Sequence, residues 1–357
     1  MDYSGRIARI RGAMDKAHLD ALIVTHLPNV RYLCGFTGSA GVLLVGSKNA
    51  FFTDGRYAEQ AADEVVGARI VVTKTPALTA VAKQLAKIVK GKVGIEAEHM
   101  SVAARNALAA ELPKGIRLAA TRSLIENLRM IKEPLEIERM RAAINLGCDL
   151  LPVALDAIKP GVREVAVAAE IEFAARKGGA QAMSFETIVA SGPRSALPHG
   201  IASEAPIRAK GFVVLDFGVI LHGYCSDMTR TVHVGVASRA ERSLYRTVLD
   251  AQMAAIATCA PGARLADVDA AARNVLKQAK LDKLFTHSTG HGVGLEIHEP
   301  PRVAQNQQDV LQPGMVITIE PGIYQAGKRG IRIEDVVAIT DTGHELLTSA
   351  RKELVEI

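Results

Sequence analysis

The sequence predicts an α/β domain followed by a larger α+β domain that contains two related halves. A chain of 357 residues is long enough for two domains at roughly 100–200 residues each. Its first third alternates short apolar runs with helical patterns, which is typical of a layered α/β structure. Its last two thirds contain one pattern twice, which indicates an internal duplication.

The elements of the first domain follow from hydrophobic periodicity. Helical spacing is present in residues 6–17, 56–66, 77–89 and 101–112. Short apolar runs expected to be strands cover residues 21–25, 42–45, 51–53, 70–73 and 92–97. The glycine-rich stretch 35–46 lacks the terminal Lys-Ser/Thr of a phosphate-binding loop, so we interpret it as a connection between strands.

The second domain is expected to open with a long helix. Glu133 and Pro134 form a typical helix start, because proline is favoured in the first turn. The helical pattern continues to about Ile158, just before a Pro-Gly pair. We therefore expect an N-terminal α/β domain over residues 1–127 and a second domain over residues 128–357.

The repeated pattern begins at Pro160 and again at Pro261. In each copy a Pro-Gly turn leads into an alanine-rich helix, then a histidine, then a strand with one acid and later a second acid. The first copy supplies His199, Asp216 and Asp227, and the second supplies His298, Glu320 and Glu334. Five features in the same order favour two related halves with a pseudo-twofold over a chance likeness of two helices.

Four of these residues are acids in otherwise apolar strands. A hairpin turn at His222-Gly223 is expected to place Asp216 opposite Asp227, and a glycine-rich turn centred on Gly327 is expected to place Glu320 opposite Glu334. Facing carboxylates are costly to bury unless a positive charge compensates them. Two divalent cations would balance four carboxylates. Pairing of the acids with Arg230 and Arg332 is the alternative.

Three histidines, His287, His291 and His298, lie within twelve positions of the segment THSTGHGVGLEIHEPP. The three glycines among them disfavour a continuous helix, so this is not a helical HExxH zinc motif. Nor does GHGVG follow a strand or carry the Lys-Ser/Thr of a nucleotide loop. Imidazole beside several carboxylates favours Mn²⁺, Co²⁺ or Zn²⁺.

Composition excludes several other classes of function. The charge of +5 is scattered and only 4% of residues are aromatic, which is not typical of a nucleic-acid-binding face. No apolar run is long enough to cross a membrane, and no signal peptide is recognisable. The four cysteines are far apart, as in a reduced cytoplasmic protein.

At these residues the second domain resembles the pita-bread metallopeptidases, which include methionine aminopeptidase, prolidase and aminopeptidase P. The ligand pattern of that family, Asp, Asp, His, Glu, Glu, is matched by Asp216 in LDFG, Asp227 in SDMTRT, His291 in TGHGVG, Glu320 in IEPG and Glu334 in RIEDV. The segments NVRYLCGFTGSAGVLLV and FFTDGRYAEQA are similar to the N-terminal domain of the prolidase, aminopeptidase P and creatinase branch. Methionine aminopeptidases usually lack this domain, and creatinases lack the ligand set.

The resemblance implies a dinuclear-metal exopeptidase that hydrolyses Xaa-Pro bonds in dipeptides or at peptide N-termini through a metal-bridging hydroxide. Mn²⁺ is the expected ion, with Co²⁺ and Zn²⁺ as alternatives. Glu320 would accept the proton, and His199 and His298 would orient the substrate and support the tetrahedral intermediate. His287 would line the same site. Arg332 would bind substrate or balance the charge of the acids.

The same branch implies a homodimer, in which Arg56 either reaches the neighbouring subunit or is an ordinary surface residue. Proline-containing peptides are the expected partners. Two other functions stay open: a pita-bread binding protein without catalysis, and a creatinase-like amidinohydrolase.

Overall fold

The computed structural model describes residues 1–88 and 91–357, and the chain forms two compact units, residues 1–129 and 130–357. The sequence placed the division two residues earlier, at 127/128. Among the described residues no helix is both long and apolar enough to span a membrane.

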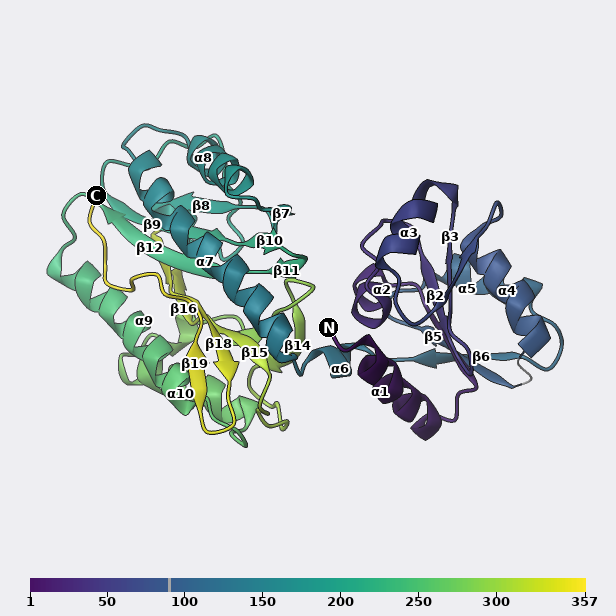
Figure 1. The fold of residues 1–357 in the computed structure, drawn as a ribbon. Helices are drawn as coiled ribbons and strands as arrows, with labels where there is room; N and C mark the ends of the chain where they lie inside the picture. Colours follow the sequence, from purple (N-terminus) through teal and green to yellow (C-terminus); the bar gives the residue numbers. More distant parts are fainter. Residues whose placement is uncertain (89–90) are drawn as a thin grey trace. The chain divides into compact units, whose positions relative to one another are not determined.

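The N-terminal unit is built around a six-stranded mixed sheet with the order β4-β3-β2-β1-β5-β6 (Figure 1). Its strands are β1 Ala21–Val24, β2 Val42–Val45, β3 Ala50–Thr53, β4 Arg69–Val72, β5 Lys92–Glu96 and β6 Arg117–Thr121. Its helices are α1 Tyr3–Lys16, α2 Leu27–Cys34, α3 Ala58–Glu64, α4 Ala77–Ile88, α5 Val102–Glu111 and α6 Glu126–Arg129, with a 3₁₀ turn at Gly55–Tyr57. The central strand β1 pairs parallel with β5 and antiparallel with β2.

Helices cover both faces of this sheet, which explains why its central strands are apolar throughout. Ile23, Leu44 and Phe52 form one core cluster with Leu85 of α4 and Leu108 of α5. On the opposite face, α2 packs against β1 and β2. The α/β architecture predicted from the alternation of apolar runs is confirmed.

Three elements of this unit were not predicted: α2, β6 and the four-residue helix α6. The eight-residue helix α2 has no side-chain cap at His26, so little in the sequence marks its start. Strand β6 is partly exposed and rich in alanine, so it lacks the usual strand signature. The predicted helix 56–66 begins instead as the 3₁₀ turn, where the Asp54 side chain accepts a hydrogen bond from the Arg56 amide. Residue 89 of the predicted helix 77–89 lies outside the described residues.

The C-terminal unit begins with the long helix α7 Pro134–Ala157, as predicted, and contains α8 Glu164–Lys177, α9 Arg239–Thr258 and α10 Leu265–Gln278. Its longer sheets are β12-β9-β8 and β14-β13-β15-β18-β19. The strands are β7 Ala182–Met183, β8 Ile188–Ser191, β9 Gly211–Phe217, β10 Val219–Leu221, β11 Tyr224–Cys225, β12 Met228–Val234, β13 Gly290–Gly292, β14 Glu299–Val303, β15 Val316–Ile319, β16 Gly322–Gln325, β17 Arg329–Arg332, β18 Asp335–Ile339 and β19 His344–Leu346. Two 3₁₀ turns, Gly192–Ala196 and Asp282–Leu284, complete the unit.

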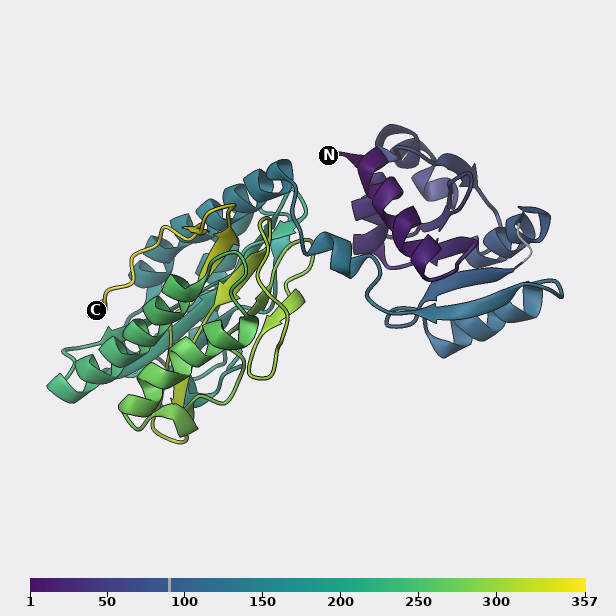
Figure 2. The ribbon, with the colours of Figure 1, turned by 90° about the horizontal axis from the view of Figure 1, so that it is seen from below.

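The predicted duplication is present in the structure. Helices α8 and α10 have 14 residues each and start at Glu164 and Leu265, in the same spacing as the two Pro-Gly turns. The turns make matching hydrogen bonds, from the Gly161 amide to the Ile207 carbonyl and from the Gly262 amide to the Leu311 carbonyl. Helices α7 and α8 pack on β9, whereas α9 and α10 run side by side in both views and share a core with β15 (Figures 1 and 2). The unit therefore consists of two related halves.

The register predicted for the first hairpin is wrong by two positions. Asp216 pairs with Thr229 and not with Asp227, because the turn residues His222 and Gly223 both have positive φ and lie between Leu221 and Tyr224. The register of the second hairpin is confirmed by the pairs Gly322–Arg332 and Ile319–Asp335. Its strands are interrupted at the two glutamates, which therefore lie at strand ends and not within strands.

Candidate metal centre and substrate cavity

One cavity of about 800 Å³ in the C-terminal unit brings together every residue that the sequence assigned to a site. Its lining includes His199, Asp216, Asp227, His287, His291, His298, Glu320, Arg332 and Glu334. This volume is typical of a small-molecule site. Residues up to 135 positions apart in the sequence thus share one space.

Strands of both halves deliver these side chains. Asp216 lies in β9 and Asp227 immediately precedes β12, whereas Glu320 follows β15 and Glu334 immediately precedes β18. His291 is the middle residue of β13. The halves are joined at this point, because the Glu334 amide donates to the Thr229 carbonyl at 3.1 Å. The acids therefore meet where the two halves adjoin.

Three of the donor atoms lie close enough together to hold one divalent ion. One ligand atom each from Asp227, His291 and Glu334 lie within 4.8 Å of one another. His291 Nε2 is 3.6 Å from Asp227 Oδ2 and 3.5 Å from Glu320 Oε1. The Nδ1 of His291 lies 2.9 Å from the Gly292 carbonyl. If Nδ1 carries the proton and donates it there, Nε2 presents its lone pair to the carboxylates, as in metal-bound histidines.

A buried oxygen without a partner supports the same conclusion. Asp216 Oδ1 is among the few buried polar side-chain atoms of the described residues that have no hydrogen-bond partner. An unsatisfied carboxylate oxygen is costly unless a cation or another donor meets it. The oxygen-rich donor set with one imidazole therefore fits hard divalent cations.

Without metal ions, burial and mutual repulsion raise the pKa values of three of the cavity carboxyl groups. Burial, with the charges of Asp216 and Glu320, raises the pKa of Asp227 well above its usual value. Burial, with the charge of Asp227, does the same to the pKa of Glu334. Burial also raises the pKa of Glu320 to about 8, although Arg332 opposes it, and lowers that of His291 to about 4. Metal ions would replace the protons held by these carboxyl groups.

Arg332 is held by a dense set of acceptors. Its Nη2 donates to Asp216 Oδ2 at 2.5 Å, its Nη1 to the Tyr324 hydroxyl at 2.7 Å and its Nε to Thr229 Oγ1 at 3.0 Å. A further bond runs to the Pro198 carbonyl. The side chain is only 4% exposed, so its donors are committed within the protein.

Arg230 does not pair with the cavity acids as the alternative interpretation required. Its Nη2 donates to Asp335 at 2.7 Å, and its Nη1 donates to the backbone carbonyls of Thr229 and Glu334 and not to the Glu334 carboxylate. Arg332 compensates Asp216, whereas Asp227, Glu320 and Glu334 have no Lys or Arg ion-pair partner among the described residues.

The histidines occupy different depths. His199 and His298 are exposed to the cavity, and the His298 ring lies edge-on to His291 with 4.4 Å between centroids. His287 is deeper, with Nε2 2.9 Å from the Tyr324 hydroxyl, and burial lowers its pKa to about 4. His199 and His298 are therefore the imidazoles available to a bound molecule.

Sequence reasoning missed one residue that lines the cavity, Arg302, and two that support its lining residues from behind, Thr229 and Tyr324. Thr229 donates to Glu334 Oε2 at 2.6 Å, and Tyr324 joins His287 to Arg332. Arg302, exposed on β14, lines the cavity without an ion-pair partner among the described residues. The strand register would have found Thr229 opposite Asp216, but nothing in the local sequence marks Tyr324 or Arg302.

Comparisons with known proteins agree with this geometry. Residues 138–341 match metallopeptidase family M24, and residues 6–131 match the creatinase/prolidase N-terminal domain. An Xaa-Pro dipeptidase from Pyrococcus horikoshii is 36% identical over 355 residues, covering 98% of each chain. The structure of an Xaa-Pro dipeptidase from Bacillus anthracis is 40% identical, covers 100% of both chains and has a TM-score of 0.97. An X-Pro aminopeptidase from Thermotoga maritima is 30% identical, covers 97% of this chain and 100% of that one, and has a TM-score of 0.90.

The predicted fold, a creatinase-type α/β domain followed by a duplicated pita-bread domain, is thus confirmed. The M24 match covers more than half of the length, and the cavity is lined by carboxylates and histidines; the chain belongs to metallopeptidase family M24.

Proposed function

We propose that this chain is an Xaa-Pro dipeptidase that depends on two divalent metal ions. The observation that carries the proposal is the convergence of four carboxylates and His291 on one cavity, with His199 and His298 exposed beside them. The names of the similar Pyrococcus and Bacillus proteins support the choice of substrate class.

Asp216, Asp227, His291, Glu320 and Glu334 would hold the ions. Mn²⁺ is the ion we expect, with Co²⁺ or Zn²⁺ as alternatives. When bound, such ions supply a Lewis acid for the scissile carbonyl and a water of lowered pKa. The chain itself supplies the orientation. Thr229, Thr318 and Arg332 donate hydrogen bonds to Glu334, Glu320 and Asp216, respectively. The Met228 backbone amide bonds to Asp227, and the Nδ1 of His291 faces the Gly292 carbonyl.

The substrate would contact the exposed histidines. His298 and His199 would donate hydrogen bonds to the oxygen that gains charge in the tetrahedral intermediate. Glu320, beside His291 Nε2, would accept the proton released as the attacking water adds. The amide before proline carries no N–H, so the cavity needs no acceptor for that group.

The choice of dipeptides rests on the two arginines of the cavity. A dipeptidase needs a cation for the proline carboxylate, whereas an aminopeptidase must leave that side open. The donors of Arg332 are committed to Asp216, Tyr324 and neighbouring groups, so we assign Arg332 to charge balance and positioning. Arg302 is exposed at the same cavity and carries the free charge.

An Xaa-Pro aminopeptidase is the second candidate, favoured by the similarity to the Thermotoga structure. A homodimer in the cytoplasm completes the proposal. All four cysteines are free, which supports a reducing compartment.

The test compares Ala-Pro with Ala-Pro-Ala after removal of metal by a chelator and addition of Mn²⁺ or Co²⁺. We expect metal-dependent cleavage of the dipeptide alone, with a raised KM for Arg302→Ala and no change for the exposed control Arg351→Ala. Cleavage of the tripeptide would instead indicate the aminopeptidase. Metal binding without cleavage of either would support the binding protein, and activity that survives chelation would support amidinohydrolysis.

A further inference from the structure

A second cavity lies entirely within the N-terminal unit, and it contains none of the residues assigned to catalysis. It has a volume of about 620 Å³ and lies beside β3, β4 and helix α4. Phe52, Val71 and Ala80 give it an apolar floor. A hollow of this size with an apolar base and polar edges has the general form of a small-molecule site.

The cavity has a strongly one-sided charge. Four cationic side chains line it, from Lys48, Arg69, Lys83 and Lys87, and no aspartate or glutamate does. None of the four forms an ion pair with any carboxylate in the described part of the chain, although other cations of the same unit do, such as Arg56 with Asp54. The uncompensated charge therefore favours an anion at this place.

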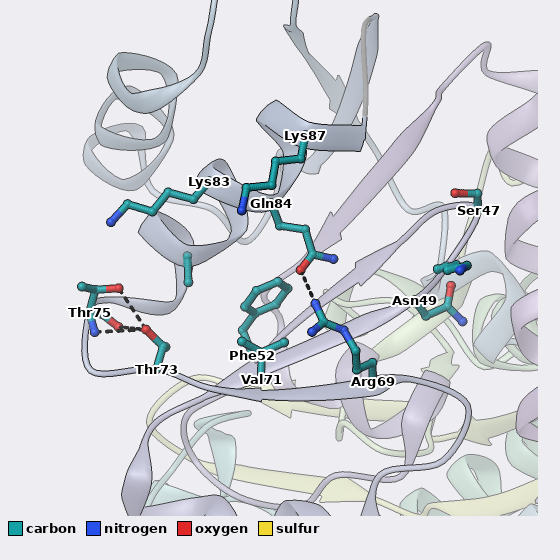
Figure 3. A pocket seen from close by; sticks show the side chains of 12 residues that line it. Ser47, Asn49, Phe52, Arg69, Val71, Thr73, Thr75, Lys83, Gln84 and Lys87 are labelled. Atoms are coloured by element: carbon teal, nitrogen blue, oxygen red, sulfur yellow. Dashed lines mark hydrogen bonds between the residues drawn. The ribbon is translucent and has the colours of Figure 1, made fainter.

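Arg69 is oriented without being neutralised. Its Nη2 donates to the side-chain Oε1 of Gln84 at 2.7 Å, and an amide oxygen carries no net charge. Figure 3 shows Arg69 and Gln84 linked in this way beside the Phe52 ring, with Lys87 on the same helix as Gln84. Lys83 and Lys87 are four residues apart, so they share one face of α4. A planar guanidinium held in place is suited to binding a phosphate through two donors.

Hydroxyl groups lie on the other side of the floor. Thr73 and Thr75 both line the cavity, and their side-chain oxygens lie 2.9 Å apart (Figure 3). The Thr73 hydroxyl already donates to the Thr75 carbonyl at 3.2 Å, so the Thr75 hydroxyl is the one that can donate to an anion oxygen.

We propose that this cavity binds a small phosphate ester, with the phosphate at Arg69 and Lys87 and the organic part over Phe52, Val71 and Ala80. A phosphate monoester carries a charge of about −1.5 to −2 at neutral pH, which two or more cations can match. The proposal concerns a site separate from the peptidase cavity and does not depend on the proposed peptidase function.

Isothermal titration calorimetry of the full chain tests the proposal with two probes, phenyl phosphate and inorganic phosphate. The double variant Arg69→Gln/Lys87→Gln removes two charges from the cavity. The control Arg105→Gln/Lys114→Gln removes two exposed charges from the same unit outside it. All three proteins should have the same melting temperature, which shows that the variants fold.

We expect one saturable site for phenyl phosphate, weaker binding of inorganic phosphate, and at least about a tenfold loss of affinity in the cavity variant only. Phosphate that binds at the metal centre would still bind to the cavity variant, so this binding can be told apart from binding at the N-terminal cavity. Absence of saturable binding up to about 1 mM, or equal weakening in both double variants, would overturn the proposal.

Discussion

The two halves of the C-terminal unit share a scaffold but contribute unequal chemistry. Their second helices, α8 and α10, have the same length, and the turns before them make the same hydrogen bonds. The first half supplies the short acids Asp216 and Asp227, whereas the second supplies two glutamates, His291 and Arg332.

The difference concerns how the negative charge of the buried acids is compensated, because an arginine of the second half pairs with an acid of the first. Asp216 lies within the regular strand β9 and is neutralised by Arg332 of the second half. Glu320 and Glu334 lie at strand ends, and no arginine in the described part of the chain forms an ion pair with them. A duplicated scaffold thus needs different side chains in its two halves to make one asymmetric site. We therefore expect substitutions at corresponding positions of the two halves to change activity and stability by different amounts.

The largest effect is expected from removing an uncompensated acid. Glu334→Gln keeps the acceptor for Thr229 but removes a negative charge, so metal binding should fail and activity should drop by about a thousandfold or more. The metal-free variant should be more thermostable than the metal-free parent at pH 8, because burial disfavours the ionised carboxyl. Metal content and melting temperature check both statements, with exposed Glu345→Gln as the control. Activity that survives the change would contradict the assignment of Glu334.

An intermediate effect is expected at the residue that links the halves. Arg332→Ala leaves Asp216 buried without its cation, which typically costs roughly 3–5 kcal/mol of stability. Activity should fall about 10–100-fold through kcat, because Arg332 positions Asp216 and does not bind substrate in our assignment. Steady-state kinetics of Arg332→Lys separate the alternatives, with the half-exposed Arg329→Lys as control. A rise in KM alone would instead favour substrate binding by Arg332.

The sequence could predict the site residues that a local pattern marks, but not the positions and roles that depend on turn conformation or tertiary packing. The repeat and the predicted hairpins located the four acids with His199 and His298, because acids in apolar strands are unusual. The clustering of histidines located His287 and His291. The register of Asp216 was missed, since it depends on a turn in which both His222 and Gly223 adopt positive φ. The role of Arg332 was left open, because its partners Tyr324 and Pro198 are set by tertiary packing that no local pattern reports.

A smaller effect concerns the pH dependence of the metal-free protein. The pKa of Glu320 is about 8 when folded, against its ordinary 4.5, so its contribution to stability is present below pH 4.5 and is lost as pH rises through 8. His291 and His287, with pKa values of about 4, oppose this only below pH 6.5, where their unfolded forms gain protons.

Between pH 6.5 and 8 the stability of chelator-treated protein should therefore fall, by about 2 kcal/mol for each proton involved. Urea unfolding at several pH values measures this slope. Metal-loaded protein should show a smaller slope, since cations then hold the carboxylates ionised. If the metal-free protein instead becomes more stable between pH 6.5 and 8, the buried carboxyl groups do not repel one another as we infer.

The smallest effect is expected outside both halves, at Arg56 of the N-terminal unit. Its side chain is 75% exposed and pairs with the neighbouring Asp54, so Arg56→Ala should leave the melting temperature unchanged. If Arg56 is only a surface residue, kcat/KM should also be unchanged. If it reaches the cavity of a second subunit in a homodimer, kcat/KM should fall while stability stays constant. Kinetics measured alongside the exposed control Arg105→Ala distinguish the two, because only a contact across subunits makes an exposed, locally paired arginine matter for catalysis.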